Sequence, residues 1–291
     1  VALFEAGGSS DIWKVNMPLA ILYAMHDPKY NYKYYSEPEP NLNNRRLFCP
    51  RGKMVGGCSA HNGMVYVRGN KNDYERWASF GLKSWSYENV LPFFKKIETW
   101  SEGENKFRGG KGILPVNQSK NKNPLFSAFI NASVEAGYKK NDDMNGEDQE
   151  GFGMYDITIH KGQRASASKY YLEPARKRKN LKVFTNSFAE RIIFEGKKAV
   201  GIEVNIKNKV TKVYANKEIV LSGGSINSPQ LLMLSGVGPE KDLKDKGINV
   251  IHSLEGVGQN LQDHLETYIQ QECKTKDTLY SYVNKINMLK I

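Results

Sequence analysis

Glycine stands beside acidic, basic or amide side chains in four separate segments of the 291-residue sequence. The first segment begins with the apolar run 1–4, which ends in Glu5 and is followed by Gly7-Gly8. Such a run predicts a buried parallel strand with an acid at its carboxyl end. In a dinucleotide-binding βαβ unit, an acid in this position binds a ribose about 20 residues after a glycine-rich phosphate turn. That hypothesis places the turn upstream of Val1, and its alternative is an ordinary strand that ends in an acid.

The second segment spans residues 50–64 and has the sequence Pro-Arg-Gly-Lys-Met-Val-Gly-Gly-Cys-Ser-Ala-His-Asn-Gly-Met. The adjacent Gly56 and Gly57 would let the backbone approach a ligand closely, and a helix that starts after them would offer free N–H groups to a phosphate. Arg51 and Lys53 add positive charge nearby. These residues predict a site for an anionic cofactor, with a plain Gly-Gly turn as the alternative.

The third and fourth segments lie later in the chain. Residues 222–239 predict a glycine turn at Gly223-Gly224 after an apolar strand at 218–221, then a helix that begins near Ser228-Pro229. A glycine turn at the carboxyl end of a strand can approach a cofactor from the edge of the sheet. Residues 256–264, Gly-Val-Gly-Gln-Asn-Leu-Gln-Asp-His, place polar side chains at the tip of a further turn.

The elements that must position these segments follow from local patterns. Apolar spacing predicts helices around 74–77, around 87–94 and over 125–137, and a short strand at 112–116. Residues 28–50 are rich in Tyr, Asn and Pro and predict a loop, and residues 142–146 predict a polar turn. Alternation of apolar and polar residues from 181 to 215 predicts a β-meander with turns at Gly196 and Asn208.

The composition limits the classes of function. The chain carries 42 Lys and Arg against 31 Asp and Glu, a net charge of +11, and 40% of its residues are hydrophobic. A strong positive charge can indicate a nucleic acid or an anionic surface as partner. The lysines are scattered, however, and the only run is 176–179, so we expect a solvated basic surface and no nucleic-acid partner. No apolar run approaches the roughly 20 residues that span a bilayer.

Several catalytic classes lack their sequence patterns. The three cysteines, Cys49, Cys58 and Cys273, form no Cys-x-x-Cys pair, so neither a zinc site nor dithiol redox chemistry is supported, and we expect no metal. The sequence also contains no Gly-x-Ser-x-Gly elbow and no His-Glu-x-x-His motif.

The four segments, taken in order, resemble the glucose–methanol–choline (GMC) flavoprotein oxidoreductases, and the resemblance extends to about His264. The overall character is most similar to insect glucose-dehydrogenase-like members. The resemblance implies an α/β fold: an incomplete Rossmann-like FAD/NAD(P)-binding domain with an α+β substrate-binding domain. It implies the first part of the FAD-binding domain at 1–27, a lid-like loop at 28–50 and an extended FAD-binding region at 51–105. Part of the substrate domain would follow at 106–165, the second FAD-binding part at 166–238, and the start of the remaining substrate domain at 239–291.

The resemblance also assigns roles to individual residues. Glu5 would hold the adenosine ribose, and residues 55–59 would line the pyrophosphate and flavin. Residues 62–65 would lie along the isoalloxazine, Ala189 would offer a backbone contact to adenine, and the turn at 224–225 would approach the cofactor from the second side. The full set of implied FAD-binding residues is Glu5, Val55, Gly56, Gly57, Cys58, Ser59, His61, Asn62, Gly63, Met64, Val65, Ala189, Gly224 and Ser225.

Two of these residues depart from the usual pattern of the family. Cys58 replaces a residue that is usually Ser, Thr or Gly, and His61 replaces an aliphatic residue. Some family members with histidine in this place bond it covalently to the flavin, so His61 is a candidate attachment site. A noncovalent histidine beside the ring is the alternative that we favour.

The activity implied is the oxidation of a small-molecule alcohol or sugar by hydride transfer to flavin N5, with a quinone or oxygen as electron acceptor. The family's base is a histidine near the C-terminus, which must lie within hydrogen-bond reach of the hydroxyl. We expect it beyond Ile291, so the chain is expected to be an internal fragment and we assign no catalytic base. His264 belongs to the fourth segment and not to that motif. Two Asn-x-Ser triplets are glycosylation sequons, and on them we expect the secretory pathway or the cell exterior. The alternatives are a non-catalytic or truncated relative that acts as a binding or structural protein, and a basic surface-binding protein without flavin.

Overall fold

The structure is a computed structural model that describes residues 1–120, 122–264, 266–274 and 277–278. The last part of the expected segment 239–291 therefore lies outside the described residues. The chain forms two compact units. The first unit comprises Val1–Ile12, Leu22–Ala60 and Leu172–Glu266, and the second comprises Trp13–Ile21, His61–Tyr171 and Thr267–Ile291. The functional segments proposed from the sequence have other bounds and stay a prediction.

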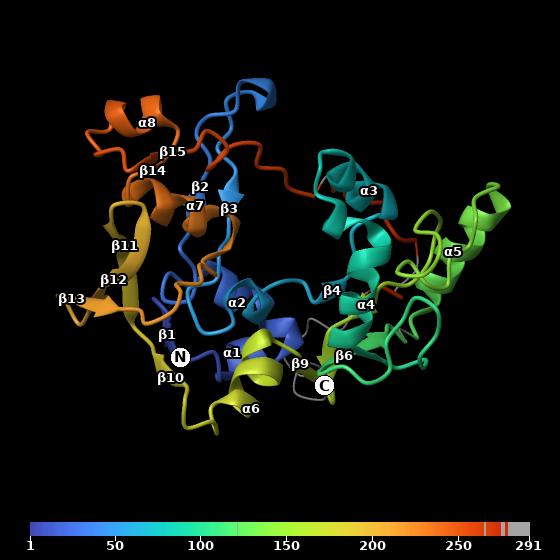
Figure 1. The fold of residues 1–291 in the computed structure, drawn as a ribbon. Helices are drawn as coiled ribbons and strands as arrows, with labels where there is room; N and C mark the ends of the chain where they lie inside the picture. Colours follow the sequence, from blue (N-terminus) through green and yellow to red (C-terminus); the bar gives the residue numbers. More distant parts are fainter. Residues whose placement is uncertain (121, 265, 275–276, 279–291) are drawn as a thin grey trace. The chain divides into compact units, whose positions relative to one another are not determined.

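The first unit combines a parallel strand pair with an antiparallel meander (Figure 1). Strand β1 (Ala2–Phe4) pairs in parallel with β10 (Lys182–Phe184), and the rings of Phe4 and Phe184 stack at 5.0 Å between centroids. The apolar run at the start of the sequence thus forms a parallel strand as expected, but not a buried one, because Ala2 is exposed and Leu3 and Phe4 are half-buried. The α/β fold class predicted from the sequence is confirmed.

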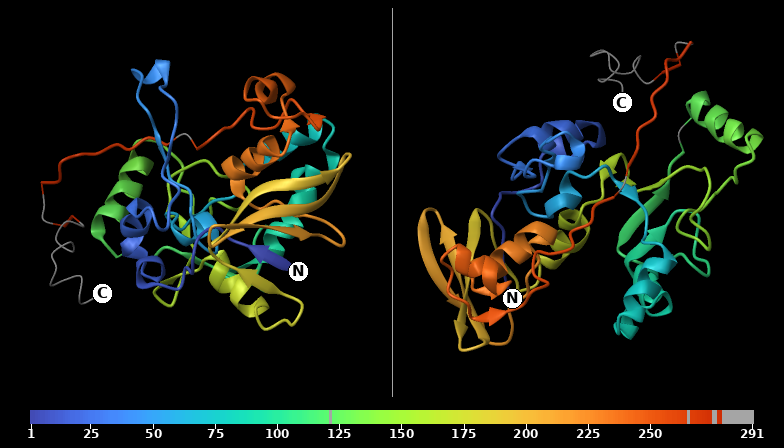
Figure 2. Two further views of the ribbon diagram at one scale, coloured as in Figure 1. Left: turned by 90° about the vertical axis from the view of Figure 1, so that its left-hand side faces the viewer. Right: turned by 90° about the horizontal axis from the view of Figure 1, so that it is seen from above.

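The meander consists of β11 (Ser187–Glu195), β12 (Lys198–Ile206) and β13 (Lys209–Tyr214), which Figure 2 shows as three long neighbouring strands. All pairings are antiparallel. Gly196 has φ +59° in the first turn, and Lys207 and Asn208 have φ +52° and +65° in the second. Such positive φ values fit the tight turns that match the twist of paired strands. The predicted meander and both of its turns are confirmed.

Helix α7 (Gly224–Leu234) is the longest α-helix described in the first unit. The sequence placed its start near Ser228-Pro229, which is wrong, because the helix begins at Gly224 and contains Pro229 in its interior. Proline there forgoes the hydrogen bond to the carbonyl of Ser225. Further α-helices and strands of this unit are α2 (Ile21–His26), whose first residue belongs to the second unit, the hairpin β2 (Tyr34–Tyr35) and β3 (Phe48–Cys49), α6 (Glu173–Ala175), β14 (Val237–Gly238), α8 (Glu240–Asp245) and β15 (His252–Ser253).

Two further expectations for this unit need correction. Residues 218–221 do not form a strand, since no ladder joins them to another described segment, and Val220 is 73% exposed. An apolar sequence becomes a strand only where a neighbouring strand takes up its N–H and C=O groups. Residues 28–50 are not wholly loop: β2 and β3 pair as an antiparallel hairpin, Tyr34 opposite Cys49.

The second unit contains a four-stranded sheet in the order β4-β7-β6-β5. Its strands are β4 (Val65–Tyr66), β5 (Glu98–Trp100), β6 (Leu114–Gln118) and β7 (Asp156–Ile157). The helices expected from the sequence are α3 (Lys71–Ser79), α4 (Tyr87–Ile97) and α5 (Pro124–Glu135), and all three are confirmed. The unit also contains α1 (Trp13–Asn16), the hairpin β8 (Ile159–His160) and β9 (Gln163–Arg164), and a π-helical turn at Ser168–Leu172.

A buried cluster of charges holds the second unit together. The guanidinium of Arg108 is fully buried, and it contacts Glu98 at 3.0 Å, Asp143 at 2.6 Å and Asp156 at 2.7 Å. Arg68 adds a second cation, 2.6 Å from Glu98. The cluster thus places two guanidinium groups against three carboxylates, so each cation has at least one opposite charge beside it, which burial requires. The segment 142–146, expected as a polar turn, supplies part of this cluster and is not merely a surface turn.

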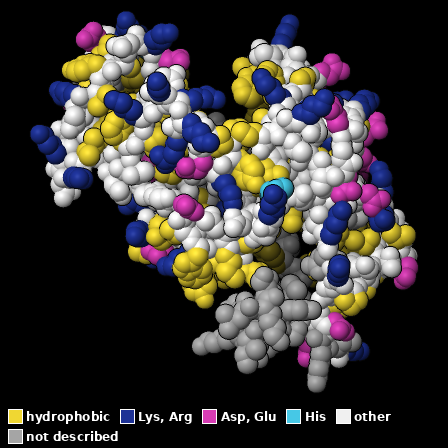
Figure 3. All heavy atoms as spheres, turned by 90° about the horizontal axis from the view of Figure 1, so that it is seen from below, with side chains coloured by type: hydrophobic (Ala, Val, Ile, Leu, Met, Phe, Trp, Pro, Cys, Tyr) yellow, Lys and Arg dark blue, Asp and Glu magenta, His cyan; other side chains and the backbone are white. Residues whose placement is uncertain are grey.

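The surface charges are distributed, as the sequence suggested. On the face that Figure 3 displays, Lys and Arg side chains are dispersed and Asp and Glu lie among them. The run at 176–179 is exposed. Within the described residues, none of the helices has the length and apolar character that crossing a bilayer requires.

Candidate functional site

Glu5 follows β1 directly, and its carboxylate folds back onto the chain. Its Oε1 accepts a hydrogen bond from the N–H of Gly7 at 2.7 Å. Its backbone is fixed on both sides, because its N–H donates to Phe184 at 2.9 Å and its carbonyl accepts from Ser187 at 2.8 Å. Burial raises the pKa of Glu5, and the Gly7 N–H and the charge of Lys53 oppose that effect. The result is a fixed, half-buried acceptor at the end of the strand.

The raised pKa of Glu5 makes a prediction about stability. The folded protein holds this proton more tightly than the unfolded chain, so stability falls as the pH rises from the usual carboxyl pKa through the raised one. Glu5→Gln keeps an acceptor for Gly7 but cannot ionise. Without added cofactor, we expect the variant to lack this fall and to gain stability over the wild type at pH 7. Urea unfolding at pH 4 and pH 7 measures both, and an equal pH dependence in the two proteins would contradict the assignment.

The first and second sequence segments cross at Gly7. A Cβ atom on Gly7 would lie 1.8 Å from the carbonyl oxygen of Lys53, so only glycine fits. Next to this crossing Gly8 bridges Met54, and the N–H of Val55 donates to the carbonyl of Gly8 at 3.0 Å. The structure therefore brings Glu5 and the double-glycine segment together. They would have to be close to each other to bind one ligand.

The double glycine itself forms a tight, left-handed turn. Gly56 and Gly57 have φ +90° and +51°, and Ser59 closes the turn by donating from its Oγ to the carbonyl of Gly56 at 2.6 Å. No α-helix follows, contrary to the expectation, because Gly57–Ala60 is a single 3-10 turn. The region beside Gly57 is open, since a Cβ there would have no heavy atom within 4 Å. Cys58 lies at the surface.

Residues 62–65, in the second unit, are held by hydrogen bonds to Thr158 and by one within the segment. Met64 is buried and takes φ +62°, and its carbonyl accepts from Thr158 through both N–H and Oγ1, at 2.8 and 3.2 Å. The side-chain oxygen of Asn62 accepts from the N–H of Met64 at 3.2 Å. Gly63 and Val65 are exposed, and a Cβ on Gly63 would meet nothing within 4 Å. His61 is buried, at 3% exposure.

The third segment places a glycine at the start of α7. Gly224 has φ +87° and open space at its Cβ position, and Ser225 beside it is exposed. The end of the same helix is fastened to the meander, because the N–H of Ile192 donates to the Oγ of Ser235 at 2.8 Å. Ala189 lies in β11 beside a register shift, where one residue is inserted opposite β12. Such bulges redirect the groups next to them.

Tyr32 lies near residues of the first, second and third segments, and no sequence pattern singled it out. Its hydroxyl interacts with Asn227 in α7, and Lys53 Nζ lies 5.7 Å from the centre of its ring. Burial and then the charge of Glu5 raise the pKa of Tyr32 to about 12, so it stays protonated at neutral pH. Only the abundance of Tyr and Asn in residues 28–50 signalled a role for this loop.

The fourth segment packs near the others in the first unit. A Cβ on Gly258 would lie 3.3 Å from the sulfur of Met233 in α7, so the backbone passes close to that helix. The N–H and the ring of His264 lower the pKa of Asp263, and the charge of Arg51 lowers it by a smaller amount. The side chain of His264 is 93% exposed.

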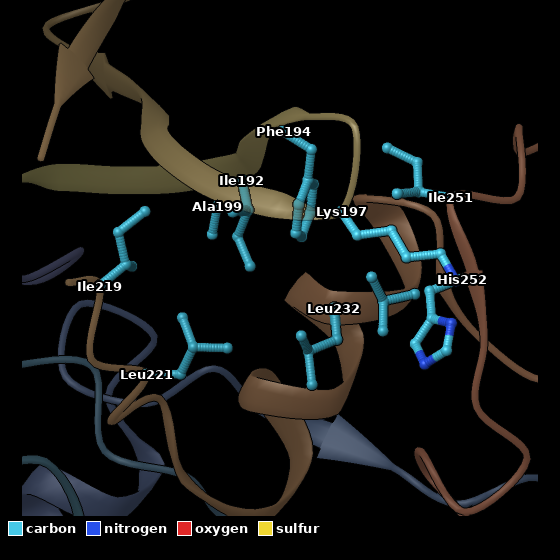
Figure 4. A pocket seen from close by; sticks show the side chains of 10 residues that line it. Ile192, Phe194, Lys197, Ala199, Ile219, Leu221, Leu232, Ile251 and His252 are labelled. Atoms are coloured by element: carbon cyan, nitrogen blue, oxygen red, sulfur yellow. The ribbon is translucent and has the colours of Figure 1, made fainter.

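A cavity in the first unit has a different character. It holds about 250 Å³ and lies between the meander and α7 (Figure 4). Its lining is mostly apolar, and Figure 4 shows Ile219 and Leu221 directed into it, opposite Ile192. The side chains of residues 218–221 thus alternate in direction as in a strand, although these residues form no ladder of hydrogen bonds with a described strand. None of the proposed cofactor residues lines this cavity, so it is separate from the candidate site.

Comparison with known proteins places this geometry in a family. The family model described as GMC oxidoreductase matches residues 2–266. The chain belongs to the GMC oxidoreductase family. The resemblance noted on the four segments is thereby confirmed, and so is the fold class that it implied.

Relatives of this GMC oxidoreductase include curated and solved proteins. It is 48% identical over 277 residues to "Oxygen-dependent choline dehydrogenase" of Brucella anthropi, covering 95% of this chain and 50% of that protein. Over 288 residues it is 48% identical to human "Choline dehydrogenase, mitochondrial", covering 97% of this chain and 48% of that protein. The chain therefore spans about half the length of the curated relatives it matches.

Two solved structures support the fold of this GMC oxidoreductase. Pyridoxine 4-oxidase from Mesorbium loti superposes with a TM-score of 0.83 at 30% identity, covering 88% of this chain and 50% of that one. An FAD-dependent oxidoreductase from Chaetomium thermophilum gives a TM-score of 0.82 at 32% identity, covering 90% and 48%. The likeness to insect glucose-dehydrogenase-like members is not tested by these relatives and stays a prediction.

Proposed function

We propose that the protein carrying this chain is an FAD-dependent oxidoreductase that oxidises the CH–OH group of a small alcohol. The convergence of Glu5, the double glycine and the start of α7 within one unit carries the proposal. Choline or a similar amino alcohol is the substrate class we favour, because the curated relatives named above are choline dehydrogenases. A sugar is the other class implied by the family, and oxygen or a quinone would accept the electrons.

The residues present fit FAD. Within the first unit, Gly57 and Gly224 each have open space where a side chain would project, which leaves backbone accessible to a ligand. The Glu5 carboxylate suits the hydroxyls of a ribose, and Arg51 and Lys53 bring positive charge suited to a pyrophosphate. When bound, FAD would supply the hydride acceptor, while this chain binds and orients it. The catalytic base is not assigned to this chain.

The colour of the purified protein tests this proposal. We expect the protein carrying this chain to show flavin absorption as isolated or after FAD is added. A protein that stays colourless after reconstitution would overturn the proposal and favour a non-catalytic binding or structural role.

Acid denaturation then distinguishes a covalent from a noncovalent role of His61. Release of all the colour into the supernatant supports the noncovalent histidine that we favour, whereas colour in the pellet that His61→Asn abolishes establishes covalent attachment.

Gly63→Ala tests whether the open space beside residues 62–65 is reserved for the cofactor. The backbone there is compatible with alanine, so we expect the unfolding free energy without FAD to change by less than about 0.5 kcal/mol. A methyl group pointing at the bound cofactor should raise the Kd for FAD about tenfold or more. Fluorescence titration measures the Kd. The matched control is Gly256→Ala, which also has open space and an ordinary φ but lies outside the proposed cofactor residues.

A further inference from the structure

Arg164 is a buried cation that bonds to residue 62, in the segment 62–65 that is expected to lie along the isoalloxazine. It stands in β9 and is 1% exposed. Its Nη1 donates to the backbone carbonyl of Asn62 at 2.7 Å and to the side-chain oxygen of the same residue at 2.8 Å. Its Nε donates to the carbonyl of Val15 at 3.1 Å. Burying a guanidinium costs free energy unless its N–H groups are hydrogen-bonded, and here they bind backbone and amide oxygens.

These contacts determine the conformation of the segment. The Asn62 side-chain oxygen accepts from Arg164 on one side and from the Met64 N–H on the other, so it closes a turn around Gly63. Met64 is left-handed, a strained conformation for a residue with a long side chain. The turn is held by Arg164 in β9 and by Thr158, all within the second unit. Its open face is the side of Gly63 and Val65.

We propose that Arg164 is a positioning residue for the flavin, acting through Asn62 to hold the backbone of residues 62–64 in the conformation that meets the ring. This inference rests on the proposed function. Arg164 contacts the segment and not the reacting atoms, so it is not a catalytic residue. Burial lowers the pKa of Arg164 to about 10, which still leaves it charged at neutral pH.

Positioning and charge predict different behaviour in two variants. Arg164→Lys keeps a buried cation, but its single ammonium cannot reproduce a planar fork that reaches Asn62 and Val15 together. Arg164→Met removes both the charge and the donors at similar length. If Arg164 positions the segment, both variants should weaken FAD binding about tenfold or more and alter the visible circular dichroism of the bound flavin. If only its charge matters, the lysine variant should match the wild type.

The experiment uses the full-length protein that carries this chain, with flavin titration, visible circular dichroism and the flavin reduction potential as readouts. Asn62→Ala and the double variant Asn62→Ala/Arg164→Met complete a cycle. We expect the double variant to bind FAD hardly worse than Arg164→Met, because both changes remove the same contact. Arg176→Met is the control, since this arginine is exposed and pairs with Glu173 at the surface.

The outcomes separate the two proposals. A wild type without flavin would overturn the proposed function and this inference with it. A flavin-loaded wild type whose Arg164 variants lose thermal stability but keep its Kd, circular dichroism and potential would overturn the inference alone, as would additive effects in the cycle. If Arg164→Met does not fold, Arg164→Lys and Asn62→Ala still decide, because unchanged flavin signals in both would also overturn it.

Discussion

Replacing Glu98 with alanine is expected to lower the free energy of unfolding by about 3–5 kcal/mol. The Glu98 carboxylate is fully buried and accepts from Arg68 at 2.6 Å, from Arg108 at 3.0 Å and from the N–H of Gly109 at 2.8 Å. Its removal would leave two buried guanidinium groups with one carboxylate fewer. Because domains are stable by only about 5–15 kcal/mol, such a loss brings the second unit close to unfolding.

Urea unfolding followed by circular dichroism measures this loss. The control is Glu104→Ala, which removes an exposed carboxylate 3.9 Å from Lys95 and should cost less than about 0.5 kcal/mol. Glu98→Gln should fall between the two, since it keeps the shape and one acceptor but not the charge. A Glu98→Ala protein as stable as the Glu104→Ala protein would show that the cluster does not contribute as described.

Gly7→Ala is expected to destabilise the first unit by at least about 2 kcal/mol and to abolish FAD binding at ordinary concentrations. The new methyl group would lie 1.8 Å from the carbonyl oxygen of Lys53 and 2.7 Å from the N–H nitrogen of Met54. Both are backbone atoms, so a side-chain rotation cannot relieve the clash. The two segments would have to separate, and with them Glu5 would move away from the turn at Gly56-Gly57.

Gly8→Ala is the control for Gly7→Ala, because the neighbouring glycine meets only the Asn186 side chain, at 3.9 Å. We expect it to unfold within about 0.5 kcal/mol of the wild type and to bind FAD. Thermal unfolding with and without FAD compares the pair. If the two alanine variants behave alike, the close crossing of the backbone is not what holds the site together.

The sequence predicted those parts of the fold that local patterns determine. Local patterns include the apolar run at 1–4, the alternation from 181 to 215 and the apolar spacing of α5. In each of them the order of apolar and polar residues over a short stretch indicates the element. Turn chemistry at Gly196 and Asn208 was equally local. The candidate site could be predicted from the sequence for a related reason. Consecutive glycines such as Gly56-Gly57 indicate backbone conformations that other residues rarely adopt.

What sequence patterns could not predict depends on partners far along the chain. Residues 218–221 alternate as a strand would, but only the fold decides whether a neighbour completes the ladder. Asp143 and Asp156 look like ordinary polar residues until Arg108 is placed against them. Tyr32 stood out no more than other tyrosines, because the two residues that affect its pKa, Glu5 and Asn227, lie far from it in the sequence.

The charge cluster of the second unit has a consequence for how that unit opens. Its members stand on β5, on β7 and in the loops that contain Arg68, Arg108 and Asp143, so no short stretch of chain can form it alone. A partly opened state would expose one buried charge while leaving its counter-ion in the interior, which costs more than keeping or losing both. Local fraying in this region is therefore disfavoured, and its amide hydrogens should exchange with solvent mainly when the whole unit opens as a single foldon.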